Sequence, residues 1–461
     1  MLLDLSKLLI NTSYEQMSVL FFNRSVGSII GAIIGSLYIQ FKPLYESLDP
    51  ISICSILSIL SSIMAYLIPF SNQLFLIQIY VTIATACFGF TEMTLQSIII
   101  KTWGDERSAP IMQGFHMIFN LGSTVGPVLM SYFVSEKSSE ACVLESDQDL
   151  AVDVVTQNMT LARAIADEAN LIYVPFAFSS ILIAISSIIF AYNGLKFKRL
   201  KIETIIHNQG LETIKIEEVE ETDEFIGSGT TTTTTTTKNV RQRQEKFERK
   251  EKSFFKYRFW MLILVFFLYF GIGGSLHWYG DNIYQYAICS LGWEVINSTF
   301  LQSVFWGTCS ISGLVGVYIL GKVDNEKFGP KFYCFIDISL IVFTFLGLYF
   351  SVLYLSGTVV VSDHLNLFNI IIWTGNILLG IAYGTAYAAG ISWVVNDYLD
   401  VTGIYFLVFV LGDFIGQMPL KFAGVIISEF SGEWFYLIEI FYVMLTLGMM
   451  LLMHFLGRFR W

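Results

Sequence analysis

The feature that most constrains this chain is a series of eleven long apolar runs. Only 14% of the 461 residues are charged and 54% are hydrophobic, whereas soluble proteins carry about a quarter charged residues. Each run approaches the ~20 residues that a helix needs to cross a bilayer. The sequence therefore predicts an all-α, polytopic membrane protein with spans at about 17–39, 51–70, 74–100, 111–134, 170–192, 259–280, 294–320, 331–356, 366–395, 402–428 and 433–457.

A polar stretch from Asn193 to Arg258 divides these runs into five and six. It is acidic at first, contains a run of threonines and ends strongly basic. Such a segment cannot bury enough apolar surface to offset the entropy of ordering it. The sequence thus predicts an N-terminal bundle of five spans over 1–192, a disordered cytoplasmic linker over 193–258 and a C-terminal bundle of six spans over 259–461.

The distribution of Lys and Arg predicts the orientation. With the linker in the cytoplasm, twenty-two of the 27 Lys and Arg residues lie inside, as the positive-inside rule requires. The acceptor patterns at Asn11 and Asn158 then lie outside, where each is a weak glycosylation signal. Cys142 and Cys289 are also expected outside, but their spacing gives no argument for a disulfide. Five spans and then six, with an external start, predict a twelve-span protein that lacks its first helix here. A genuine eleven-span protein is the alternative.

Arg24 shares a helical face with Gly27, Gly31 and Gly35. Small residues at this spacing let a neighbouring helix approach closely. An arginine within a span is costly unless it reaches the interface or pairs with an acid. Glu92 is the best partner in this half of the chain, so we expect an Arg24 contact that holds Glu92 ionised.

Glu92 lies one turn before Gln96 in the span over 74–100. An unpaired carboxylate at mid-membrane is costly, so Glu92 is expected to be paired, protonated, or in contact with a cation or substrate. Both residues are therefore candidates for a substrate or ion site.

The span over 111–134 carries a polar stripe. His116, Asn120 and Thr124 recur every four residues, with Gln113 a turn earlier, so they share one helical face. We expect Gln113, His116 and Asn120 to contact substrate. A polar packing face without a ligand is the alternative.

The same span carries a second set of predicted packing and hinge positions. Gly122 and Gly126 form another small-residue face, and Pro127 removes an internal hydrogen bond and favours a bend. The alternative is a bent, tightly packed helix with no ligand role.

In the second half, Asp413, Gln417 and Lys421 lie on one stripe of the span over 402–428. Asp413 and Gln417 are candidate substrate contacts. Lys421 reaches outward or pairs with Asp413 or Asp281, so a structural ion pair and a substrate role both remain open.

Aromatic residues accompany these polar groups. Tyr383 and Tyr387 lie one turn apart in the span over 366–395, and His277 and Trp278 lie at the outer end of the span over 259–280. Aromatic faces beside amides and carboxylates suit a sugar, because rings pack on its C–H face while polar groups pair with its hydroxyls. The same residues suit an interfacial aromatic belt, which we expect for Trp278 and Tyr279.

No enzyme signature stands out. The sequence contains no HExxH, phosphate loop, serine elbow or paired CxxC, which indicates neither an enzyme nor a bound cofactor or metal and leaves ATP-driven transport unsupported. Coupling to an ion gradient or facilitated diffusion remains. The net charge of −11 does not indicate nucleic acid binding, because the basic residues lie mostly in the linker.

Two helical halves joined by a long cytoplasmic linker resemble the major facilitator superfamily, whose halves are repeats around a mid-membrane site. The chain is more specifically similar to the sodium-dependent glucose transporter branch. The resemblance rests on motifs spread over most of the chain: Leu3-Asp4-Leu5, Arg24 through Gly35, Trp103-Gly104, Met112-Gln113-x-x-His116, Gly122-x-x-x-Gly126-Pro127, Phe266-Phe267-Leu268-Tyr269-x-Gly271, Ser303-Val304-Phe305-Trp306-Gly307, Gly390-Ile391-Ser392-Trp393 and Val401-Thr402-Gly403.

The chain departs from this branch at two places. The branch tends to carry Asp, with Asn four residues later, where this chain has Glu92 and Gln96. It also tends to carry a glutamate and an arginine near the positions held here by Gly273 and Gly313. The loss of that charge pair bears on sodium coupling and on the substrate, but not on the fold.

The resemblance implies two six-helix bundles, with eleven of the twelve spans present, and a secondary transporter of a small polar solute. A hexose is the favoured substrate, and Na⁺ is the candidate coupling ion. We expect a monomer in the plasma membrane whose halves rock around a central site. One alternative is a proton-coupled sugar symporter with Glu92 or Asp413 as proton carrier. The other is a non-transporting solute sensor or scaffold.

Overall fold

A computed structural model describes residues 14–41, 48–71, 73–131, 173–193, 236–322, 329–356, 362–398, 403–419 and 432–457. All regular elements in these ranges are helical. They are α2 (Tyr14–Gln40), α4 (Pro50–Leu67), the 3-10 turn η1 (Ile68–Phe70), α5 (Leu74–Ser131), a helix over Tyr173–Asn193, α9 (Thr236–Cys289), α10 (Val295–Lys322), α11 (Pro330–Ser356), α12 (Ser362–Asp397), α13 (Gly403–Gln417) and α15 (Glu433–Gly457).

Each of the eleven predicted spans coincides with a helical segment. Nine segments within the described ranges are long and apolar enough to cross a bilayer. The other two predicted spans correspond to the second part of α5 and to α13, which is shorter. The rest of the predicted span over 402–428, from residue 420, lies outside the described residues. The all-α, multi-pass fold class is therefore confirmed.

α5 is a continuous helix of 58 residues by its backbone, but it cannot be straight. In a straight helix Phe88 and Phe119 would lie about 46 Å apart, whereas their ring centroids are 6.1 Å apart. The chain therefore folds back between them. Pro110 lies inside the helix in this segment, where a proline removes a backbone hydrogen bond and favours a bend. α5 thus consists of two neighbouring helical arms, the first before and the second after the segment that contains Pro110.

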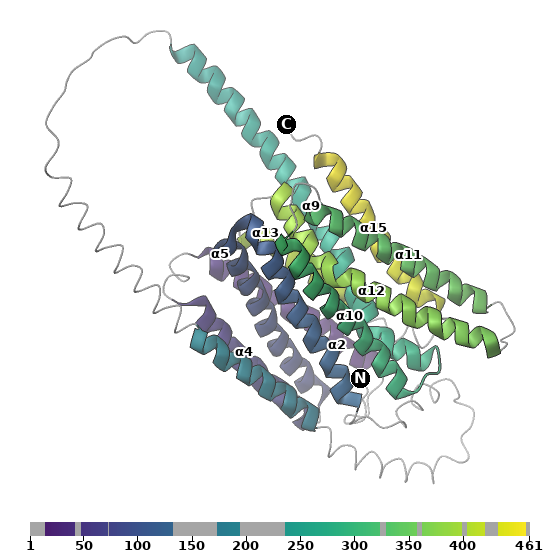
Figure 1. Cartoon of the computed structure of the whole chain (residues 1–461). Coiled ribbons are helices and arrows are strands. Elements are labelled where there is room, and N and C mark those ends of the chain that lie inside the picture. The colour runs from purple at the N-terminus through teal and green to yellow at the C-terminus, as the bar shows by residue number, and fades with distance from the viewer. Residues whose placement is uncertain are drawn as a thin grey trace.

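α9 begins earlier than the sequence predicts. It starts at Thr236, within the segment predicted as a disordered linker over 193–258, and Figure 1 shows its first part projecting from the bundle. The stretch before residue 258 is rich in Arg, Lys, Glu and Gln, which favour a helix even where no apolar face is buried. Residues 194–235 of the predicted linker lie outside the described residues.

α9 also ends later, at Cys289 rather than near residue 280. This extension places Trp278 and Tyr279 inside the bundle, where they are 1% and 0% exposed. Both rings pack against Phe435 of α15. The prediction of an interfacial aromatic belt at these two residues is therefore wrong, because the helix continues beyond the polar residues that were taken as its end.

The glycine ridge of α2 lies against the first arm of α5. A Cβ atom at Gly31 would lie 2.7 Å from the carbonyl carbon of Ala86 and 2.8 Å from the backbone nitrogen of Phe90. A Cβ at Gly35 would lie 3.1 Å from the Phe90 carbonyl oxygen, and one at Gly27 would also approach the α5 backbone. The two helices approach so closely because glycine has no side chain.

Gly122 and Gly126 differ from the prediction of a close-packing face. A Cβ at either position would meet no atom within 4 Å in the described part of the chain, because no described helix approaches that face. Pro127 lies inside α5, which continues as far as Ser131.

The helices form two halves that meet side by side (Figure 1). α5 packs against α10 and α12, and α2 packs against α13. Within the first half, the Ser55 and Ser62 hydroxyls of α4 donate to the carbonyl oxygens of Ser187 and Ser180, each at 2.7 Å. These bonds hold the helix over Tyr173–Asn193 against α4.

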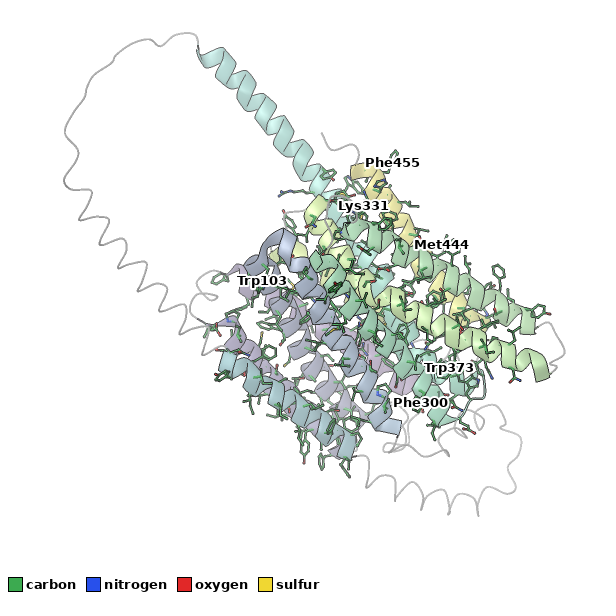
Figure 2. All side chains as sticks on the ribbon, viewed as in Figure 1. Trp103, Phe300, Lys331, Trp373, Met444 and Phe455 are labelled. Atoms are coloured by element: carbon green, nitrogen blue, oxygen red, sulfur yellow. The ribbon has the colours of Figure 1, made fainter. Side chains whose placement is uncertain are left out.

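Large apolar side chains cover the outside of the bundle (Figure 2). Trp103, Phe300, Met444 and Phe455 are each more than half exposed. Exposed apolar surface of this extent marks a membrane-facing or partner-facing surface, and the length of the helices points to the membrane.

Some sequence predictions fall outside the described residues. These are the glycosylation signals at Asn11 and Asn158, the stripe residue Lys421, and Cys142. Cys289, at the end of α9, is disulfide-bonded.

Candidate functional site

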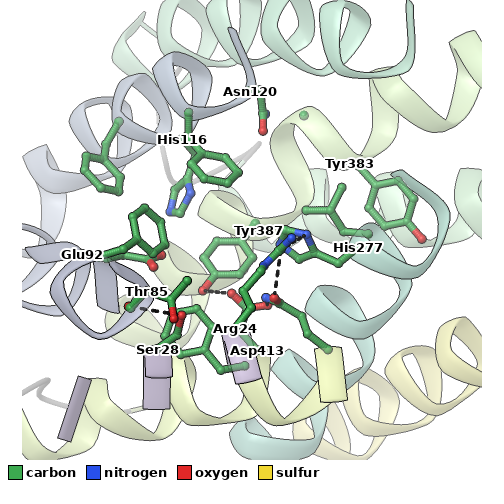
Figure 3. A pocket seen from close by; sticks show the side chains of 17 residues that line it. Arg24, Ser28, Thr85, Glu92, His116, Asn120, His277, Tyr383, Tyr387 and Asp413 are labelled. Carbon is green, nitrogen blue, oxygen red and sulfur yellow. Dashed lines mark hydrogen bonds between the residues drawn. The ribbon is translucent and has the colours of Figure 1, made fainter. Parts of the chain in front are cut away.

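A small pocket lies where the two halves meet. Side chains of α2 and α5 line it from the N-terminal half, and side chains of α9, α12 and α13 line it from the C-terminal half (Figure 3). Its cavity volume is about 90 Å³, well below the ~300 Å³ at which small-molecule pockets begin. Six of the eight predicted substrate or ion residues line it: Arg24, Glu92, His116, Asn120, Asp413 and Gln417.

Arg24 of α2 connects the two halves. Its Nη1 atom donates to Asp281 Oδ2 at 3.0 Å, and its Nη2 atom donates to Gln417 Oε1 at 3.3 Å. His277 Nδ1 lies 3.3 Å from both Arg24 Nη2 and Asp281 Oδ2. The Arg24 side chain is 33% exposed and that of Asp281 is 19% exposed, so this ion pair is partly buried.

The partner of Arg24 therefore differs from the predicted Glu92. Asp281 belongs to the other half, and it enters the site because α9 continues beyond residue 280. No sequence rule within one half could have identified a partner that depends on how the two halves dock.

Glu92 and Gln96 form a pair inside the first arm of α5. Gln96 Nε2 donates to Glu92 Oε1 at 3.0 Å, and both side chains are buried. Glu92 Oε2 and Gln96 Oε1 have no hydrogen-bond partner within the described residues. Buried acceptors without donors are costly, so a proton, a cation or a hydroxyl of a ligand would stabilise this pair.

The polar stripe of the second α5 arm divides into two roles. His116 and Asn120 face the pocket (Figure 3), and the His116 ring lies 4.5 Å from the Tyr387 ring, centroid to centroid. Gln113 instead donates through Nε2 to the carbonyl oxygen of Gly384. Gln113 thus links α5 to α12 through this hydrogen bond and does not line the pocket.

Asp413 of α13 closes the other side of the pocket. Its Oδ1 accepts from Gln417 Nε2 at 3.0 Å, and its Oδ2 accepts from the Tyr387 hydroxyl at 3.3 Å. A Cβ at Gly273 would lie 2.7 Å from the Asp413 carboxyl carbon. Glycine at position 273 therefore leaves room for the carboxyl group of Asp413.

Sequence reasoning missed several residues of the site and its surroundings. Ser28 and Thr85 line the pocket, but hydroxyl residues are common in such helices and give no distinct signal. His277 and Tyr383 were noted only as part of aromatic clusters. Glu439, fully buried in α15, was missed although a single carboxyl group in an apolar span is a recognisable signal.

The arrangement suits a polar solute together with a cation. The pocket holds the carboxyl groups of Glu92 and Asp413 and one guanidinium, that of Arg24, which is already paired with Asp281. The pocket lining thus contains more carboxyl groups than guanidinium groups. No group of three or more His, Cys, Asp or Glu side chains among the described residues is arranged to hold a metal ion.

Two helical halves with a pocket between them, lined by polar and aromatic side chains, are typical of an integral multi-pass membrane protein of the transporter class. The sequence model of the Major Facilitator Superfamily matches residues 10–418, which is most of the chain. The chain therefore belongs to the Major Facilitator Superfamily, whose members are transporters rather than enzymes.

The curated relatives lie in one branch of this family. The chain is 22% identical over 413 residues to the sodium-dependent glucose transporter 1A of Mus musculus, covering 89% of this chain and 81% of that protein. It is 21% identical over 412 residues to the sodium-dependent glucose transporter 1 of Homo sapiens, covering 89% of this chain and 66%, just under two thirds, of that protein.

Solved structures support the same fold. The proton:xylose symporter XylE bound to 6-bromo-6-deoxy-D-glucose superposes with a TM-score of 0.60 at 11% identity, over 98% of this chain and 89% of that chain. A partially occluded inward open form of XylE from E. coli gives a TM-score of 0.54 at 10% identity, over 95% and 88% of the two chains.

Proposed function

We propose that this protein is a secondary-active transporter of a hexose across the plasma membrane, coupled to sodium and working by alternating access. The observation that carries the proposal is the small pocket between the two halves, which is lined by polar and aromatic side chains from both of them. The names of the mouse and human relatives support a sugar substrate and sodium coupling.

The lining of the pocket supports a polyhydroxylated solute. Asn120 and Gln417 offer amides, Asp413 offers a carboxyl group, and Tyr383 and Tyr387 offer ring faces. A few polar groups placed among aromatic walls are typical of small-molecule sites. The rings would pack against the C–H face of a sugar, while the polar groups would pair with its hydroxyls.

The size of the pocket supports alternating access. A cavity of about 90 Å³ is too small for free entry of a small molecule, so the halves must separate for a solute to bind. The Arg24–Asp281 ion pair spans the two halves and would have to break in any opening motion that parts α2 from α9.

Glu92 and Gln96 support a cation site. Their two oxygens without donors, Glu92 Oε2 and Gln96 Oε1, are ligands of the kind that hard cations such as Na⁺ prefer. A proton on Glu92 would satisfy the same carboxyl oxygen. Proton coupling at Glu92 is therefore the second candidate, and it is favoured by the same observation.

The experiment is uptake of radiolabelled D-glucose in cells that express the Glu92→Ala variant, with surface protein measured by biotinylation. We expect uptake to fall at least tenfold while surface expression is retained, because the variant removes the unpaired carboxyl group. The matched control is Glu294→Ala, since Glu294 is exposed and lies outside the pocket. Uptake retained in Glu92→Ala would remove Glu92 from the site, and glucose binding without flux in the unmodified protein would identify a sensor instead.

A further inference from the structure

A further buried carboxyl group, outside the pocket, lies in the C-terminal half. Glu439 of α15 is 0% exposed. The Ser275 hydroxyl of α9 is within hydrogen-bond reach of its Oε2 atom, whereas its Oε1 atom has no partner among the described residues. No Lys, Arg or His in the described ranges forms an ion pair with Glu439.

The titratable groups that face Glu439 are tyrosines. They are Tyr279 on α9, Tyr383 on α12, and Tyr436 and Tyr442 on α15. α11 also packs against α15, but it brings no charged side chain into contact with Glu439 in the described ranges. Tyrosine hydroxyls are neutral at ordinary pH, so none of these groups offsets a negative charge on Glu439.

An ionised carboxylate without a counter-charge is costly in a bundle core. A hard metal cation would need several oxygen ligands, whereas Glu439 has a single hydroxyl contact in the described residues. We propose that Glu439 is a proton-binding site, and that Ser275 and Tyr383 connect this site to the wall of the central pocket.

The connection is a chain of hydroxyl groups. The Ser275 hydroxyl contacts both Glu439 Oε2 and the Tyr383 hydroxyl, and Tyr383 lines the pocket. Figure 3 shows the Tyr383 ring at the pocket wall, with its hydroxyl pointing away from His116 and Glu92. The Ser275 hydroxyl thus connects Glu439 to the Tyr383 side chain and so to the wall of the pocket.

The protonation state of Glu439 determines which groups donate and which accept in this chain of hydrogen bonds. When Glu439 carries the proton on Oε2, that O–H donates to Ser275 Oγ, and Ser275 donates to the Tyr383 oxygen. When the proton leaves, Ser275 donates to the carboxylate, and Tyr383 donates to Ser275. The two hydrogen bonds made by Ser275, one to Glu439 and one to the Tyr383 hydroxyl, therefore reverse with the protonation state of Glu439.

This site goes beyond the proposed transport function and does not depend on it. Its test is infrared difference spectroscopy of the purified, full-length protein at neutral pH, without any solute. The carbonyl stretching band of a protonated carboxylic acid is absent from a carboxylate. We expect such a band in the unmodified protein and a weaker band in Glu439→Gln, because the contribution of Glu439 is lost while any other protonated acid, such as Glu92, still absorbs. Glu294→Gln, at an exposed carboxylate, leaves the band unchanged.

Two further variants test the connection between Glu439 and the pocket. Ser275→Ala and Tyr383→Phe each remove a hydroxyl of the chain, so we expect both to shift the Glu439 band, with the larger shift for Ser275→Ala. Ser275→Ala also provides the test if Glu439→Gln does not fold. A spectrum unchanged in Glu439→Gln, or the absence of any such band in the unmodified protein, would overturn the proton site. A band that neither hydroxyl variant moves would overturn the connection.

Discussion

Gly31→Ala is the substitution whose effect follows most directly from the geometry. The added Cβ would lie 2.7 Å from the Ala86 carbonyl carbon and 2.8 Å from the Phe90 nitrogen, where ordinary contact begins at 3.4 Å. The Ala86 carbonyl oxygen would lie closer still, so α2 and α5 would have to separate by more than about 0.7 Å. The atoms in the way belong to the backbone, so no side-chain rotation relieves the clash.

Overpacking of this kind typically costs about 1–3 kcal/mol. Alanine favours a helix over glycine by about 1 kcal/mol, which offsets only part of the loss. Because α2 and α5 both line the pocket, their separation would also change its shape. We therefore expect Gly31→Ala to lower both the stability of the protein and its glucose uptake.

The assay is thermal unfolding of detergent-solubilised protein, followed by fluorescence-detected size exclusion. The matched control is Gly122→Ala, where the new Cβ meets nothing within 4 Å among the described residues. We expect the apparent melting temperature to fall by several degrees in Gly31→Ala, on the order of 2–4 °C per kcal/mol. In Gly122→Ala we expect it to stay unchanged or rise slightly, because alanine favours the helix and its Cβ meets no atom within 4 Å among the described residues. Equal melting temperatures for both variants and the unmodified protein would refute the close packing of α2 on α5.

Two further variants test the pocket itself. Arg24→Ala should lower the free energy of unfolding by about 1–3 kcal/mol, between the limits for exposed and buried ion pairs. In a double-mutant melting series, adding Asp281→Asn should recover part of that loss. Strictly additive losses would contradict the Arg24–Asp281 pair. Gly273→Ala should displace the Asp413 carboxyl group and cut glucose uptake at least tenfold at equal surface expression. The control, Gly347→Ala, should leave uptake unchanged, because its added Cβ meets no atom within 4 Å among the described residues. Equal uptake in the two variants would contradict the placement of Asp413.

The helices could be predicted from sequence because apolar length alone decides what crosses a bilayer. Their ends could not, and α9 shows why. The sequence predicts an end near residue 280, where the polar residues His277 and Asp281 lie. Inside the fold Arg24 contacts both of them, so the helix continues to Cys289 without burying an unpaired charge.

The candidate site was predictable in part, for a related reason. Glu92, His116 and Asp413 are polar residues in apolar spans, and such residues mark functional positions. The contacts between them depend on how the halves dock, which no local pattern contains. The partner of Arg24 was misjudged on that account, since its own half offered Glu92 while Asp281 lies 257 positions away in the sequence.

The turn within α5 is a further case. Sequence analysis predicted two spans separated by a short connection, and the Phe88–Phe119 contact agrees with that arrangement. The backbone stays helical through the connection, which no hydrophobic pattern could have indicated because the connecting residues are polar.

Under the proposed function, solute crosses the membrane through the pocket between the two halves. The most direct measurement is uptake of labelled D-glucose in cells that express the full chain, in sodium buffer and in buffer with choline in place of sodium. We predict saturable uptake above that of mock-transfected cells, reduced when choline replaces sodium. No uptake above mock cells in either buffer, with the protein present at the surface, would contradict hexose transport by this chain, and equal uptake in both buffers would contradict sodium coupling alone.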